Sequence, residues 1–246
     1  AAGESEKISI SASAVKQLLG PEKVKPTFIS RKDAVGIANG LAWTSVGGEM
    51  LPVEVAIIPG GSGKIEITGS LGDVMKESAQ LAISYARVHA EKYGIAADKL
   101  KTLDIHIHAP EGAVPKDGPS AGVTLTTALI SALSGYPVRH DLAMTGEITL
   151  HGNVLPIGGL KEKSMAAYRE GISTVLIPKD NAVDLHEVDA EVKEKIRFIP
   201  VEQLSQVLKH ALIMPGQTAS RAAPAVPQAT SLIAGEKAPK EPAAVM

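Results

Sequence analysis

Two residues, Ser120 and Lys163, have side chains that together are suited to cleaving an ester or amide bond. Ser120 stands among small residues at the start of an apolar stretch, and Lys163 ends a short Gly-Gly-Leu-Lys-Glu-Lys run further along the chain. A serine hydroxyl becomes a nucleophile only when a neighbouring base takes its proton. A lysine amine serves as that base when burial lowers its pKa well below about 10.4. The pair therefore predicts a serine–lysine hydrolase.

Periodicity leaves two lysines as candidates for the base. Lys161 and Lys163 both fall at the start of a helix predicted over residues 160–171. Residues two apart point to different faces of a helix, and each of these faces also carries apolar residues. Most lysines on helices are solvated, so the pattern alone does not choose between the two.

The surroundings of Ser120 also fit a different hydrolase. Residues 118–122 read Gly-Pro-Ser-Ala-Gly, which matches the G-x-S-x-G nucleophile elbow. An elbow needs a buried strand directly before the serine, whereas residues 109–117 read as a loop. A Ser-His-Asp esterase using His186 or His210 is the resulting alternative. On the local motif alone, Ser120 is equally well an ordinary residue in the first turn of a helix.

Two further motifs resemble binding sites, one for a metal ion and one for ATP. His106 and His108 share one face of a predicted strand, but no third metal ligand is evident nearby, which favours histidines that are structural or line a site. Residues 60–64 resemble a P-loop, yet Ile58 and Ile65 stand where the pattern needs glycine and Ser/Thr. We therefore predict a hairpin turn there and no ATP site.

Composition narrows the function further. The 246 residues carry a net charge of −2, which favours neither nucleic acid nor an anionic membrane as a partner. The absence of cysteine excludes disulfides, thiolate zinc sites and cysteine nucleophiles. The N-terminus has no secretory signal pattern, and no apolar run reaches about 18 residues. We expect a cytoplasmic protein that is not embedded in a membrane.

Strand and helix patterns alternate along the chain, which predicts an α/β (α+β) fold. The helix over residues 73–93 has Asp73 as its expected N-cap. The expected strands are residues 51–58, 64–68, 102–108, 175–177 and 196–199, and residues 142–150 are expected to form a strand or one arm of a hairpin. The expected helices are residues 8–20, 73–93, 119–134, 160–171 and 201–212.

Three ordered motifs resemble one known family. They are residues 115–122 (PKDGPSAG), 144–149 (MTGEIT) and 155–163 (LPIGGLKEK), and the resemblance also includes residues 40–43 (GLAW) and 68–78 (TGSLGDVMKES). Together they resemble the proteolytic domain of Lon, the ATP-dependent protease. The resemblance places this domain at residues 33–214 and implies a compact α/β domain with mixed sheets and flanking helices. Residues 1–32 would be a remnant of a preceding ATPase module and its linker, and residues 215–246 a disordered Pro/Ala-rich tail.

The resemblance also assigns roles. It implies that Ser120 is the nucleophile, that Lys163 is the base, and that the Thr145 hydroxyl orients the Lys163 amine. Its supporting residues are Glu147, His106 and His108, which line the site, and Asp117, which influences whether the site is open or blocked. It further implies a homo-hexameric ring that cleaves unfolded polypeptides, with ATP and Mg belonging to an ATPase module outside this chain and no cofactor within it. A non-catalytic ring-assembly module is the remaining alternative.

Overall fold

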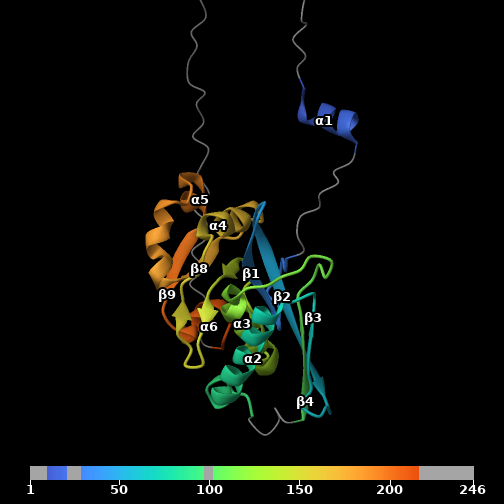
Figure 1. The fold of residues 1–246 in the computed structure, drawn as a ribbon, viewed down its shortest axis with the longest axis vertical. Helices are drawn as coiled ribbons and strands as arrows, with labels where there is room; N and C mark the ends of the chain where they lie inside the picture. Colours follow the sequence, from blue (N-terminus) through green and yellow to red (C-terminus); the bar gives the residue numbers. More distant parts are fainter. Residues whose placement is uncertain (1–9, 21–28, 97–101, 216–246) are drawn as a thin grey trace, which may run out of the picture.

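The computed structural model describes residues 10–20, 29–96 and 102–215 of the chain (Figure 1). Most of the predicted tail over residues 215–246 and much of residues 1–32 lie outside this part, so the predicted boundaries of the domain stay predictions. The N-terminal helix does appear, as α1 (Ala12–Leu19), capped by the Ser11 hydroxyl. None of the helices in the described residues is long and apolar enough to cross a membrane.

A seven-stranded mixed sheet forms the centre of the fold, in the order β3-β4-β2-β1-β5-β8-β9. Its strands are β1 (Ile37–Thr44), β2 (Gly47–Pro59), β3 (Ile65–Thr68), β4 (Leu103–His108), β5 (Leu142–Met144), β8 (Thr174–Pro178) and β9 (Arg197–Val201). Only β2 runs opposite to its neighbours in this sheet. A small second sheet pairs β6 (Glu147–Ile148) with β7 (Val154–Leu155).

Helices cover both faces of the large sheet, which confirms the α/β class (Figure 1). Alternate residues of one strand enter different apolar clusters: Leu142 and Met144 of β5 join one cluster, and Ala143 joins the other. This alternation is expected when both faces of a strand are buried. The first cluster contains α2 (Asp73–Val88), α3 (Gly122–Ser134) and α6 (Leu204–Ala211), and the second contains α4 (Leu160–Arg169) and α5 (Ala190–Lys195).

The predicted hairpin at residues 60–64 is wrong. The chain does turn there, but β3 pairs in parallel with β4, and β4 lies between β2 and β3. The turn is held by Asp104 of β4, whose Oδ1 accepts hydrogen bonds from the backbone N–H groups of Ser62 (2.8 Å) and Lys64 (2.7 Å). The later strand β4 therefore lies beside β2, where a hairpin would place β3. Local turn signals do not reveal this arrangement.

The predicted N-cap at Asp73 is also wrong. The N-cap of α2 is Gly72, whose lack of a side chain leaves the capping position open. The carboxylate of Asp117 takes that place, because its Oδ1 accepts from the N–H of Met75 at 3.0 Å. A side chain at Gly72 would collide with this carboxylate, since a Cβ there would lie 2.3 Å from Cγ of Asp117. The cap therefore ties α2 to the loop that precedes Ser120.

Three other predicted elements have different bounds in the structure. The segment predicted as a helix over residues 73–93 ends as α-helix at Val88 and continues as a 3₁₀ turn, η1 (Ala90–Tyr93). Residues 142–150, predicted as a strand or hairpin arm, divide into β5 and β6, which belong to different sheets, and β6 pairs antiparallel with β7 as the arm of a hairpin. The predicted last helix over residues 201–212 begins three residues late, because Val201 still belongs to β9.

Candidate active site

Ser120 lies in a 3₁₀ turn, η3 (Pro119–Ala121), directly before the buried helix α3. Pro119 suits the first position of a helix because it has no N–H to leave unpaired. Gly118 before it has φ 132°, a conformation that glycine reaches at low cost. The chain reaches the serine through a loop rather than a strand, so the condition for a nucleophile elbow is not met.

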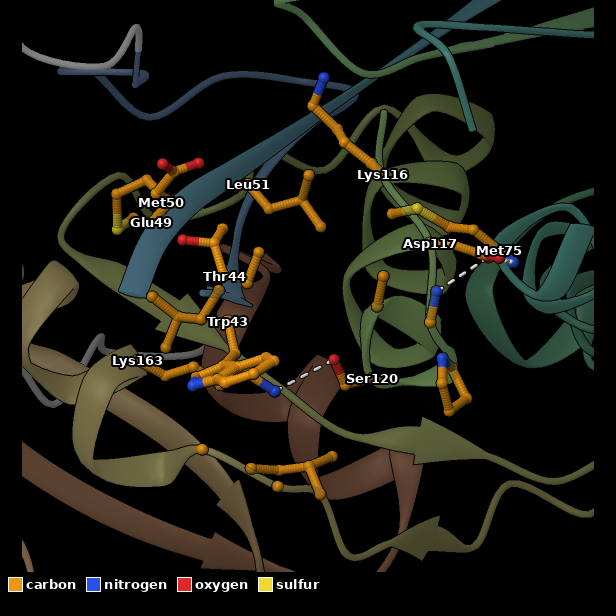
Figure 2. Close-up of a pocket in the computed structure, with 18 of the residues that line it drawn as sticks. Trp43, Thr44, Glu49, Met50, Leu51, Met75, Lys116, Asp117, Ser120 and Lys163 are labelled. Atoms are coloured by element: carbon orange, nitrogen blue, oxygen red, sulfur yellow. Dashed lines mark hydrogen bonds between the residues drawn. The ribbon is translucent and has the colours of Figure 1, made fainter. Parts of the chain in front are cut away.

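Lys163 reaches Ser120 from the opposite side of the sheet. It lies on the second turn of α4, and its side chain is only 3% exposed. Its Nζ donates to Ser120 Oγ at 3.1 Å (Figure 2). Burial lowers the pKa of Lys163 from 10.5 to about 8, because a site shielded from water disfavours the ammonium form. The other candidate, Lys161, is exposed to solvent.

The two residues meet where β5 ends. The chain leaves β5 at Met144, and the next residue, Thr145, is 1% exposed. Its hydroxyl accepts from Lys163 Nζ at 3.3 Å and donates to the carbonyl oxygen of Ser120 at 3.4 Å. The N–H of Gly146 donates to the same carbonyl at 2.8 Å. The carboxyl end of a short parallel strand therefore fixes the backbone of the serine and a neutral partner for the lysine.

A clamped loop brings the chain to Ser120. The Lys116 ammonium donates to the carbonyl oxygens of Glu111 (2.7 Å) and Val114 (3.1 Å), which closes the loop on itself. The backbone of Lys116 also bonds to the segment before α2. Its N–H donates to the carbonyl oxygen of Ser70 at 3.0 Å, and its carbonyl oxygen accepts from the N–H of Gly72 at 2.8 Å. Partial burial lowers the pKa of Lys116. Because Asp117 also caps α2, the segment before Ser120 is held from both sides.

A cavity of about 700 Å³ opens onto the pair. Apolar side chains make much of its wall, including Met50, Leu51, Met75 and Val114. Its lining also includes the polar and charged residues Thr44, Glu49, Glu111, Lys116 and Asp117. A largely apolar hollow with a few polar groups is typical of a substrate site.

Not all predicted site residues meet here. His106 and His108 lie on β4, where both rings contact the hydroxyl of Thr68, at 2.9 and 2.7 Å, and they are not among the cavity-lining residues. Glu147 pairs in β6 next to the serine turn and does not line the cavity either.

The histidines of the esterase alternative lie elsewhere. His186 is exposed at the end of η4 (Lys179–His186), and His210 is on α6. Burial, with help from nearby Arg197, Lys209 and Arg139, lowers the pKa of His210. Neither histidine lines the cavity, so the described residues do not form the arrangement that an esterase triad requires.

Two residues at or behind the cavity wall receive no role from the sequence patterns. Trp43, the single tryptophan of the chain, lines the cavity from β1. Asn181 is buried behind the wall, where its amide accepts from the N–H of Ile157 (2.9 Å) and donates to its carbonyl (2.8 Å). A lone tryptophan inside a motif of small residues is a signal for the first. Nothing in the local sequence marks the second.

These observations define a mixed α/β domain in which a buried lysine amine contacts a serine hydroxyl at an open cavity. A family model described as the Lon protease (S16) C-terminal proteolytic domain matches residues 9–214. The chain belongs to this family, as the sequence motifs predict.

Curated relatives agree. The chain is 53% identical over 210 residues to the Lon protease of Brevibacillus choshinensis, covering 85% of this chain and 27% of that protein. It is 54% identical over 206 residues to the Lon protease of Clostridium acetobutylicum, covering 84% and 26%. It is 52% identical over 213 residues to Lon protease 1 of Syntrophobacter fumaroxidans, covering 87% and 26%. The chain thus spans about a quarter of the length of these relatives.

Proposed function

We propose that this chain is a serine endopeptidase that hydrolyses peptide bonds with Ser120 as nucleophile and Lys163 as general base. The observation that carries the proposal is the 3.1 Å contact between a serine hydroxyl and a buried lysine amine whose pKa is about 8. An amine with that pKa is neutral in a useful fraction of molecules near neutral pH, so it accepts a proton readily. Membership of the Lon protease family supports the same reaction class.

The reaction proceeds in two proton-balanced halves. Neutral Lys163 takes the proton of Ser120 Oγ as this oxygen attacks the peptide carbonyl carbon. The resulting oxyanion faces the N–H groups of the turn at the N-terminal end of α3, where the helix dipole favours negative charge. The carbon–nitrogen bond then breaks, and the Lys163 ammonium gives its proton to the leaving amine. In the second half Lys163 takes a proton from water as the water oxygen attacks the acyl carbon. The bond between the acyl carbon and Ser120 Oγ then breaks, and the Lys163 ammonium returns its proton to Oγ, which restores both residues.

Thr145 acts as a positioning residue in this scheme. Its hydroxyl holds the Lys163 amine without adding a negative charge, which would raise the pKa of the lysine and keep it protonated. Asp117 positions the serine loop by capping α2. We do not assign His106, His108 or Glu147 a step in the reaction.

The test is hydrolysis of an unstructured fluorogenic peptide by the parent, Ser120→Ala, Lys163→Ala and Lys161→Ala proteins. We expect the first two variants to lose activity and Lys161→Ala to keep most of it, with unchanged circular dichroism for all. Loss of activity in Lys161→Ala alone would reject the assignment of the base. Activity that depends on His186 or His210 would favour the esterase, and a parent that neither cleaves peptide nor reacts with a boronate would favour a non-catalytic ring module.

We extend the proposal to the assembly and its substrates. We propose unfolded polypeptides as the substrates, because an extended chain can enter the open cavity. We also propose that the protein forms a homo-hexameric ring in the cytoplasm. No G-x-x-x-x-G-K-[ST] pattern occurs in residues 1–246, so ATP with Mg should leave peptide hydrolysis by this chain unchanged. Native mass spectrometry tests the ring, and ATP-stimulated degradation of a folded protein by this chain alone would contradict the proposal.

A further inference from the structure

Trp43 occupies an unusual position for a large apolar side chain. It is 59% exposed, yet it lines the cavity that holds Ser120 and Lys163. Its inner side packs tightly on Gly159, because a Cβ at Gly159 would lie only 2.7 Å from Trp43 Cδ1 and 2.9 Å from Cγ. Gly159 is the N-cap of α4 and has φ 70°, so both conformation and space require glycine there. The indole is therefore seated against the first turn of the helix that carries Lys163.

Lys163 lies one helical turn beyond the glycine on which this indole packs. Long side chains on a helix lean toward its N-terminus and cover the preceding turn. For Lys163 that turn begins at Gly159, four residues earlier, where the backbone N–H of Lys163 bonds the carbonyl of Gly159 at 3.0 Å. In the view of Figure 2 the Trp43 ring overlaps the Lys163 side chain near the dashed line to Ser120, and both residues line the same cavity. The indole thus packs on the turn that the Lys163 side chain is expected to follow, while Trp43 remains 59% exposed to solvent.

Charged neighbours do not account for the neutral tendency of Lys163. The charged side chains lining its cavity are Glu49 of β2 and Glu111, Lys116 and Asp117 of the serine loop. On α4 the adjacent charges are Lys161 and Glu162, and β6 contributes Glu147. Among the described residues, burial is the cause that lowers the pKa of Lys163. The groups that exclude water from the amine therefore determine its proton affinity.

We propose that the Trp43 indole is the shield that keeps water from the Lys163 amine, and that Trp43 is thus a positioning residue that tunes the general base. The proposal rests on the proposed peptidase function. It assigns Trp43 an effect on the protonation of Lys163 rather than a contact with substrate. Removal of the ring should admit water to the amine and return its pKa toward 10.5.

The test is the pH profile of kcat/KM for an unstructured peptide between pH 6 and 10. We expect Trp43→Ala to raise the apparent pKa of the acid limb by about 1, which lowers kcat/KM about tenfold at pH 7 and less than twofold at pH 9.5. Trp43→Phe keeps a ring against Gly159 and should stay within about threefold of the parent at pH 7. Val46→Ala is the matched control, because Val46 is 89% exposed on the same hairpin and does not line the cavity.

Other outcomes would overturn the shield. A Trp43→Ala protein whose KM rises by the same factor at every pH identifies a substrate contact instead. An unchanged profile shows that water is excluded by other groups. Circular dichroism checks the fold, and Trp43→Leu replaces Trp43→Ala if the smaller residue unfolds the protein.

A direct titration separates this idea from the function on which it rests. The pKa of the Lys163 amine can be followed by NMR of isotope-labelled lysine, with the signal assigned from Lys163→Met. A higher amine pKa in Trp43→Ala than in the parent supports the shield even if no peptide is cleaved, in which case only the proposed function fails. An equal amine pKa in both proteins rejects the shield even if Lys163 proves to be the base.

Discussion

Replacing Lys163 with methionine should make the domain more stable while abolishing its activity. The lysine is 3% exposed and burial lowers its pKa to about 8, whereas the unfolded chain has an ordinary lysine pKa of 10.5. Below pH 8 both states carry the proton, and the folded state bears the full cost of a buried ammonium. Because a difference of one in pKa corresponds to 1.36 kcal/mol, this cost is about 3 kcal/mol at pH 7.

The sign of the pH dependence follows from the same difference. Between pH 8 and 10.5 the unfolded state binds more protons than the folded state, so the stability of the parent rises with pH. The lysine term should shrink to about 1 kcal/mol at pH 9.5. Lys163→Met lacks the titrating group. Its advantage over the parent should therefore fall by about 2 kcal/mol between pH 7 and 9.5.

Urea unfolding at pH 7 and at pH 9.5, with Lys161→Met as the control, measures this effect. Methionine is shorter than lysine and leaves the hydroxyls of Ser120 and Thr145 without their amine, but both changes give an offset that does not depend on pH. Lys161 is exposed, so its variant should show no such pH-dependent difference. A difference between Lys163→Met and the parent that stays constant across this pH range would refute the buried-amine argument.

Three further variants test how the site is held. Gly48→Ala puts a Cβ 1.9 Å from the carbonyl oxygen of Glu162, so α4 must move. We expect the free energy of unfolding to fall by about 2 kcal/mol or more, as measured by thermal unfolding, and peptide turnover to fall markedly. Asn181→Ala leaves the N–H and the carbonyl of Ile157 without their amide partners and should cost about 1–3 kcal/mol in urea unfolding. Asn181→Asp should not recover this loss, because its carboxylate would face two acceptors of the Asn181 amide, the Ile157 carbonyl (2.8 Å) and Asp184 Oδ2 (2.6 Å). Asp117→Ala removes the cap of α2 and should cost about 1 kcal/mol, whereas Asp117→Asn should recover part of it; equal stability of these two variants would show that the cap contributes nothing.

The sequence predicts the chemical groups of the site better than it predicts their arrangement in space. The residue types at positions 120 and 163, and the order of the motifs around them, are enough to indicate a serine–lysine pair. Helical periodicity left Lys161 and Lys163 equal, because apolar residues flank both on their respective faces. The distinction depends on which face of α4 meets the sheet, and that is decided by contacts with β1 and β2, more than 100 residues earlier in the chain.

The errors share one physical cause. The turn after β2 has local hairpin signals, but its partner strand is displaced by β4. Asp73 has the right residue type and position for an N-cap, but the carboxylate of Asp117, 42 residues beyond the Met75 N–H that it accepts from, occupies that place. Trp43 sits in a strand with no local pattern that points to α4. Each feature depends on a contact between distant segments, whereas the periodicity of apolar residues reports only on neighbours within one element.

Contacts between distant segments also determine which charged groups lie near the Lys163 amine, and so they affect the chemistry of the site. A carboxylate beside the amine would hold it in the ammonium form, so a working base needs neutral partners. Asp117 is the carboxylate nearest to Ser120 in the sequence, but the backbone N–H groups of Met75 and Gly118 both donate to its Oδ1. These bonds hold the charge at the N-terminus of α2, where the helix dipole stabilises it. The amine is left with the hydroxyls of Ser120 and Thr145, so one capping interaction stabilises a helix and helps keep the base neutral.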